Sequence, residues 1–97
     1  MIIEIPNGTV VDVTTLIGAA ETAEIALESN FDTSLTIYLT LAATPPTSTD
    51  ECEATLQPLR SSPFCQRRVT GEAGSKVYAM TAFNPSNETV KIRASEA

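Results

Sequence analysis

Apolar and polar residues alternate along most of this chain, and the alternation is clearest over residues 35–41. Leu35, Ile37, Leu39 and Leu41 would all face one side of a strand, with Thr and Tyr between them. A two-residue period is that of a half-buried β-strand. The sequence therefore predicts a strand here, with one face in a core.

The same rhythm predicts strands on both sides of this segment. Residues 19–28 suit a helix by their Ala and Glu content, but their apolar positions alternate, and we favour a strand. Residues 77–83 carry apolar or small side chains on both faces, which is typical of a strand in the middle of a sheet or against a partner. Residues 90–95 alternate cleanly and predict a last strand.

Turn residues suggest how the strands pair. Asn7-Gly8 lies between the alternating segments 3–5 and 11–13, which predicts a β-hairpin. Residues 52–57 and 64–70 flank a turn that contains proline. We expect these two segments to form a second hairpin.

Seven to eight short strands separated by turns are typical of a sandwich or barrel, and 97 residues make one domain. We predict a single all-β domain over residues 1–97, a small antiparallel β-sandwich or barrel that is Ig-like or jelly-roll-like. Residues 1–6 should form an N-terminal arm or an edge strand. Residues 43–50, which contain Pro45-Pro46, should form an exposed loop.

The composition offers few groups for catalysis. The chain has no histidine, and histidine is both the usual general base and the commonest zinc ligand. We therefore expect no enzyme and no cofactor. Asp50, Glu51 and Glu53 offer oxygen ligands for calcium, but their spacing lacks the regular alternation of a calcium loop, which favours a solvated acidic edge.

The charge balance excludes two classes of partner. Six Lys and Arg against twelve Asp and Glu give a net charge of −6, which repels phosphate backbones and anionic lipids. We expect neither nucleic acid nor membrane as a partner. The apolar runs fall short of the roughly 20 residues that span a bilayer, and Glu4 interrupts an opening segment that has no basic residue, so we expect no export signal.

Cys52 and Cys65 flank the proline-containing turn of the second predicted hairpin. If that hairpin is symmetric about Pro58 and Leu59, the two cysteines lie opposite each other, at the separation of about 4.5–5.5 Å that a disulfide tolerates. Closing the loop would add roughly 3 kcal/mol of stability. Two buried thiols in a reducing cytosol are the alternative, and the sequence leaves both open.

Arg60, Arg67 and Arg68 gather positive charge around the same turn. Arginine forms bidentate hydrogen bonds with carboxylates. These side chains are expected either to dock an acidic neighbouring protein or to pair internally with Glu51 and Glu53.

Residues 22–28, 74–83 and 90–95, together with the succession of strands and turns, resemble small tailed-phage virion proteins of the capsid decoration or cement type. The resemblance implies a β-sandwich or barrel on the outer capsid that clamps neighbouring major capsid proteins together. It further implies the major capsid protein or other virion proteins as partners, a homo-oligomer on the particle, a location in the virion and synthesis in the host cytoplasm. No binding residue carries over from the family.

A clamp works by burying surface and by adding an edge strand to a neighbour's sheet. From this we predict contacts through three parts of the chain. They are the arm with Ile2, Ile3 and Ile5, the outer face with Tyr78 and Met80, and the edge with Arg67 and Arg68.

Three alternatives remain open from the sequence, and one of them is a host-targeting phage accessory protein. The pattern fits a phage neck or tail component equally well. A protein of another class, a secreted inhibitor or adhesion domain, would present residues 58–63 as a loop constrained by a bridge between Cys52 and Cys65.

Overall fold

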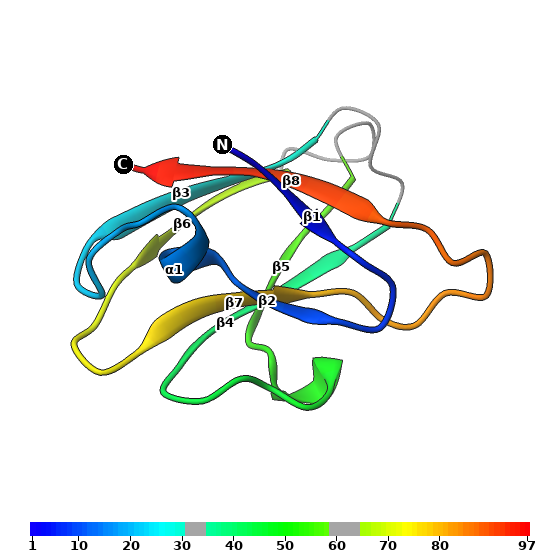
Figure 1. Ribbon diagram of the computed structural model, residues 1–97, viewed down its shortest axis with the longest axis horizontal. Coiled ribbons are helices and arrows are strands. Elements are labelled where there is room, and N and C mark those ends of the chain that lie inside the picture. Colours follow the sequence, from blue (N-terminus) through cyan, green and yellow to red (C-terminus); the bar gives the residue numbers. More distant parts are fainter. Residues whose placement is uncertain (31–34, 59–64) are drawn as a thin grey trace.

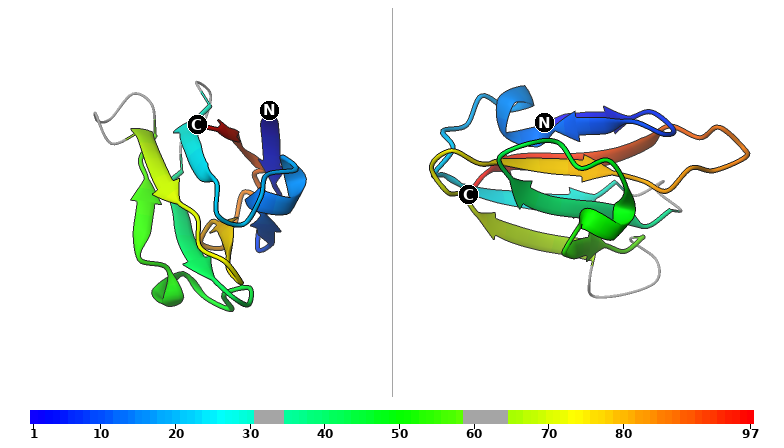
Figure 2. Two further views of the ribbon diagram at one scale, coloured as in Figure 1. Left: turned by 90° about the vertical axis from the view of Figure 1, so that its left-hand side faces the viewer. Right: turned by 90° about the horizontal axis from the view of Figure 1, so that it is seen from below.

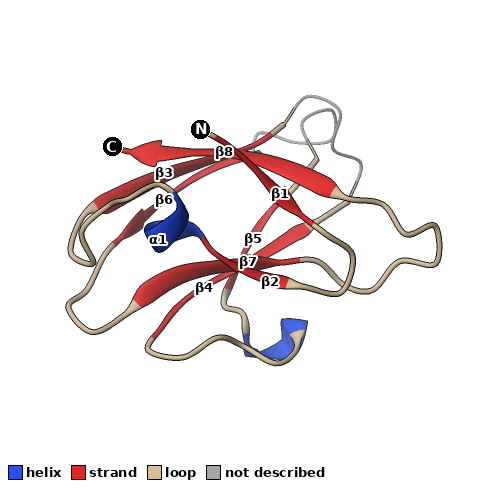
Figure 3. Ribbon diagram, in the orientation of Figure 1, coloured by secondary structure: helices blue, strands red, loops and turns tan. Residues whose placement is uncertain are grey.

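The computed structural model describes residues 1–30, 35–58 and 65–97. In these ranges eight β-strands form two stacked four-stranded sheets (Figure 1). Sheet A has the order β1 (Ile2–Ile5), β8 (Val90–Glu96), β3 (Glu24–Ser29) and β6 (Gln66–Thr70). Sheet B has the order β2 (Val10–Asp12), β7 (Lys76–Met80), β4 (Ile37–Ala42) and β5 (Ala54–Leu56). The helix α1 (Val13–Leu16) and the 3-10 helix η1 (Thr49–Glu51) lie outside the sheets (Figure 3).

The strand ladders define how the chain is wound. β1 pairs with β8, β2 with β7, β3 with β6 and β4 with β5, always antiparallel. The chain is therefore one long antiparallel hairpin rolled up into two sheets, which the ladders β3–β8 and β4–β7 complete. This connectivity is the jelly roll. The predicted all-β sandwich is confirmed, and the barrel alternative is wrong, because no ladder among the described strands joins the two sheets.

The core lies between the sheets, and the two-residue period decides which side chains enter it. Val90, Ile92 and Ala94 of β8 point inward, as do Ile37 and Leu39 of β4. Each large aliphatic side chain buried in this way contributes roughly 1.5–3 kcal/mol. The strands predicted over residues 35–41 and 90–95 are thus confirmed as β4 and β8, and the strand favoured within residues 19–28 is β3.

Both predicted local hairpins are wrong. β1 and β2 lie in different sheets, and so do β5 and β6. The turn at Asn7-Gly8 is present, and the N–H of Thr9 donates to the carbonyl of Pro6 at 3.1 Å, but this turn leads the chain from sheet A to sheet B. In a jelly roll most successive strands change sheets, so a good turn marks a reversal without fixing which strands pair.

The helix α1 fills the side of the sandwich between β1 and β2 (Figure 2). Asp12 caps it, since its carboxylate accepts from the N–H of Thr15 at 3.0 Å. The buried hydroxyl of Thr14 accepts from the N–H of Val77 at 2.9 Å and so ties the helix to sheet B. Leu16, at the end of the helix, remains 49% exposed.

The opposite side of the sandwich is joined by hydrogen bonds from sheet A to the β5 region. Arg67 of β6 donates from Nε to the carbonyl of Thr55 at 3.1 Å. The hydroxyl of Ser29, at the end of β3, donates to the carbonyl of Gln57 at 2.7 Å. These contacts hold the edges β5 and β6 together without a strand ladder.

Candidate binding surface on sheet A

The outer face of sheet A is hollowed into a shallow groove of about 610 Å³. Its floor includes Ala26 and Ser95, which are cross-strand neighbours on β3 and β8. Both side chains are small, so the longer side chains around them stand above the sheet. The rim includes Ile2, Gln66, Arg68 and Arg93.

The register of the four strands sets these side chains in two rows across the sheet. The first row is Ile2, Arg93, Glu28 and Gln66, and the second is Ser95, Ala26 and Arg68. Cross-strand neighbours of this kind have Cβ atoms about 4.5–5.5 Å apart. Strands that are far apart in the sequence thus build one surface.

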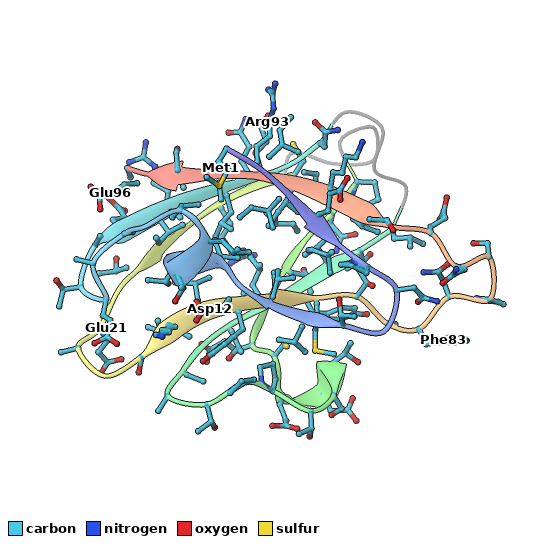
Figure 4. All side chains as sticks on the ribbon, viewed as in Figure 1. Met1, Asp12, Glu21, Phe83, Arg93 and Glu96 are labelled. Atoms are coloured by element: carbon cyan, nitrogen blue, oxygen red, sulfur yellow. The ribbon has the colours of Figure 1, made fainter. Side chains whose placement is uncertain are left out.

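Two arginines in this groove have little or no internal partner. The Arg68 guanidinium lies 3.8 Å from a Glu24 carboxylate oxygen, and both side chains are well exposed, so this ion pair is weak. The Arg93 side chain is exposed and forms no ion pair or hydrogen bond with any residue that the structure describes. Figure 4 shows its side chain pointing away from the sheet near Met1. Glu28 accepts a hydrogen bond from Gln66 at 3.0 Å instead.

Three of the predicted contact residues meet at this groove. Ile2, Arg67 and Arg68 come from β1 and β6, the two edge strands of sheet A, and all three are exposed. Arg67 and Arg68 point to opposite sides of their strand, and Arg67 is held by its bond to Thr55. Arg68 therefore stands on the outer face, whereas Arg60 lies outside the described residues.

Ile3 and Ile5 do not belong to the surface. They are 4% and 0% exposed and lie in the core, so the prediction that they contact a partner is wrong. β1 pairs with β8 along its whole length, which makes this segment an edge strand and rules out the free arm. The strand period explains the difference, because Ile2 points outward where Ile3 and Ile5 point inward.

The prediction that Tyr78 and Met80 form an exposed outer face is also wrong. These side chains are 6% and 7% exposed, although they stay outside the core between the sheets. β7 lies between β2 and β4, as a strand with two apolar faces should. Residues 43–53, which we call the cover segment, cross the outer side of sheet B (Figures 1 and 2), and within it Pro46 is buried.

Cys52 and Cys65 are free thiols in this structure. They precede β5 and β6, which belong to different sheets, so the cross-strand pair that the predicted hairpin required does not form. Burial, and then the nearby carboxylates of Glu51 and Glu53, raise the pKa of the Cys52 thiol. The thiolate, which is the reactive form, is disfavoured there.

Arg93, Ala26 and Ser95 were not predicted as site residues. The alternation of Arg93 with Ile92 and Ala94 shows from the sequence that it points outward. What the sequence does not show is that β8 lies between β1 and β3, because these pairings join residues far apart in the chain. The groove depends on these long-range pairings.

No family model, curated protein or solved structure matches this chain. The residues with defined placement contain no group of three or more metal-ligating side chains. In the same residues no helix is long and apolar enough to cross a membrane.

Proposed function

We propose that this chain is a non-enzymatic structural protein of a virus particle, a decoration or cement protein that binds neighbouring major capsid proteins through the groove on sheet A. The observation that carries the proposal is this groove, whose rim holds an Arg93 side chain without a partner among the described residues, on a chain with a net charge of −6. A cation that finds no partner within an acidic protein is available to a partner's carboxylate.

The shape of the groove favours a polypeptide over a small molecule. Sites for small ligands bury most of the ligand's surface, whereas this hollow is shallow and lies on the face of a sheet. An extended segment of a capsid protein would place an acidic side chain between Arg68 and Arg93 and an apolar one beside Ile2. Arginine suits this role because its planar fork binds carboxylates through two hydrogen bonds.

The fold agrees with this role by analogy. Jelly rolls recur in viral capsid domains and in lectins. Because one fold serves many functions, the analogy supports the proposal without carrying it. The docking residues are therefore argued from this chain alone.

The first experiment asks whether the chain travels with particles. A lysate that contains the assembled particles is separated on a density gradient, and each fraction is probed for this chain. We expect it to sediment with the particles. A chain that stays at the top of the gradient, with particles banding below it, overturns the proposed function.

A matched pair of variants tests the groove itself. Ala26→Trp fills the floor of the groove and should abolish sedimentation with particles, whereas Ala73→Trp adds the same bulk to an exposed turn and should not. Circular dichroism checks that both variants fold. Equal sedimentation of the two would show that the docking surface lies elsewhere.

A further inference from the structure

The edge strand β1 has one side without a partner in the described structure. Met1 and Ala94 exchange both backbone hydrogen bonds, each at 2.9 Å. Backbone groups alternate in direction along an antiparallel strand, so Ile3 also bonds to β8. Ile2 and Glu4 must then direct their N–H and C=O groups away from the sheet.

Apolar side chains gather around this free edge. Among the residues with defined placement, the large hydrophobic side chains that remain exposed are Met1 (66%), Ile2 (55%), Leu16 (49%) and Phe83 (77%). The first three line an open groove of about 440 Å³ along β1. Natural edge strands are usually protected by lysine, by proline or by a covering segment. β1 contains no lysine and no proline.

We propose that β1 pairs antiparallel with β1 of a second copy of this chain, about a two-fold axis beside Ile3, so that two copies of sheet A become one eight-stranded sheet. Ile2 of each copy lies opposite Glu4 of the other. The free N–H and C=O groups of these residues then form four intermolecular hydrogen bonds. The groove along the edge is the space that the second strand fills.

The other two-fold registers are less favourable. An axis beside Glu4 sets two carboxylates opposite each other, which is destabilising. It also sets Ile2 opposite Pro6, which has no N–H to donate. An axis beside Ile2 sets Ile2 of one copy opposite Ile2 of the other. The backbone groups of Glu4 then have no residue of the second β1 opposite them and remain unpaired by it.

Charge complementarity indicates a second copy as the occupant. Arg93 is the cross-strand neighbour of Ile2, so in the proposed register one row reads Arg93, Ile2 and Glu4 of the second copy. The Cα atoms of Arg93 and of Glu4 of the second copy are then about 10 Å apart, twice the strand spacing. The two long side chains can meet across this distance above Ile2. Neither charged side chain forms a hydrogen bond or ion pair with another described residue of its own chain.

The association and the groove on sheet A share Arg93, but the backbone hydrogen bonds between the two β1 strands do not involve the groove. Engaging Arg93 at the edge leaves Arg68 on the outer face. The two-fold axis would place two such grooves on one continuous sheet. If the groove docks a capsid protein, the dimer bridges two neighbours.

The free backbone N–H of Glu4 allows a direct test by sedimentation velocity over a range of concentrations. Glu4→Pro removes this donor without taking a hydrogen bond from the β1–β8 ladder, and we expect it to weaken the dimer by at least about tenfold, since two hydrogen bonds per dimer are lost. Glu4→Gln keeps the donor and loses only the ion pair, so it should weaken the dimer about two- to fivefold.

Disulfide trapping tests the register. In a Cys52→Ser, Cys65→Ser background, chains with Ile2→Cys and chains with Glu4→Cys should cross-link when mixed and oxidised, because the two positions face each other across the axis. Each chain alone should cross-link poorly. Strong cross-linking of either chain with itself contradicts the register.

The proposal is overturned if the wild-type chain remains monomeric up to about 1 mM, or if Glu4→Pro dimerises as the wild type does. Its failure is separable from failure of the docking function. Ala26→Trp should still dimerise, and a chain that dimerises but stays off particles contradicts the docking function alone.

Discussion

Sheet A and sheet B have the same number of strands and the same inward alternation, but their outer faces differ. On sheet B, whose outer side the cover segment crosses (Figures 1 and 2), Thr40, Tyr78 and Met80 are 7%, 6% and 7% exposed. On sheet A, Arg68 and Arg93 are exposed around a groove. Nothing in the described structure crosses that groove.

The comparison separates two uses of a sheet's outer face. Where a segment of the same chain lies over the outer face, the apolar side chains on that face add to the stability of the protein. Where the face is bare, its side chains are free to bind another molecule. Substitutions on the covered face should therefore change the stability of the protein, whereas substitutions on the bare face should change its binding to a partner.

The largest effect is expected on the covered face. Tyr78→Ala removes a buried aromatic ring, and such truncations cost about 3–5 kcal/mol. The free energy of unfolding, measured with urea, should fall by about this amount. A loss below about 1 kcal/mol would show that the cover segment does not bury this ring in solution.

The matched variant on the bare face is Arg93→Ala, which also lies on a central strand. Its side chain is exposed and makes no bond within the described chain. The free energy of unfolding should change by less than about 0.5 kcal/mol. A larger loss would mean that sheet A is also covered.

The period of the sequence was sufficient to predict which side chains enter the core. Leu39 and Ile92 lie where the alternation puts them. The pairing of strands was not predictable in this way, because turn residues such as Asn7-Gly8 act locally while the jelly roll pairs β1 with β8. The period also shows that Tyr78 points away from the core, but it does not show which segment covers it.

The two-residue period also made part of the candidate site predictable, because it shows which side chains of a strand point outward. Arg68 and Ile2 are outward positions of their strands and both reach the groove. Ile3 was misassigned because a strand at a sheet edge was treated as an arm, whose side chains would all be free. The groove floor at Ala26 depends on small residues meeting across strands, which requires the register.

A smaller effect is expected within the cover segment. Pro46→Gly removes a buried ring and also raises the entropy of the unfolded chain, with a combined loss of about 1–3 kcal/mol. Pro45→Gly is the matched control, because Pro45 is exposed and shares only the unfolded-state effect. Urea unfolding of both variants isolates the contribution of burial, and equal losses would contradict a packed cover.

The smallest effect concerns the hydrogen bonds that tie the cover segment to itself. A Glu51 carboxylate oxygen accepts from the Thr47 hydroxyl and from the Thr47 N–H, the latter at 3.1 Å. These two bonds, the hydroxyl first, lower the pKa of Glu51. A lowered pKa in the folded state gives stability that is present above the unfolded-state value, about 4.3 for glutamate, and is lost as the pH falls through the folded-state value.

Glu51→Gln tests this contribution, because an amide keeps an acceptor but carries no charge. The wild type should be slightly more stable than Glu51→Gln at pH 7, and the difference should vanish near pH 3, where the carboxylate of the wild type is protonated. Glu53→Gln, a nearby variant with the same loss of charge, corrects for the overall charge effect. If the two variants change in parallel across this pH range, the Thr47 bonds do not stabilise the cover segment, and its packing on sheet B must hold it without them.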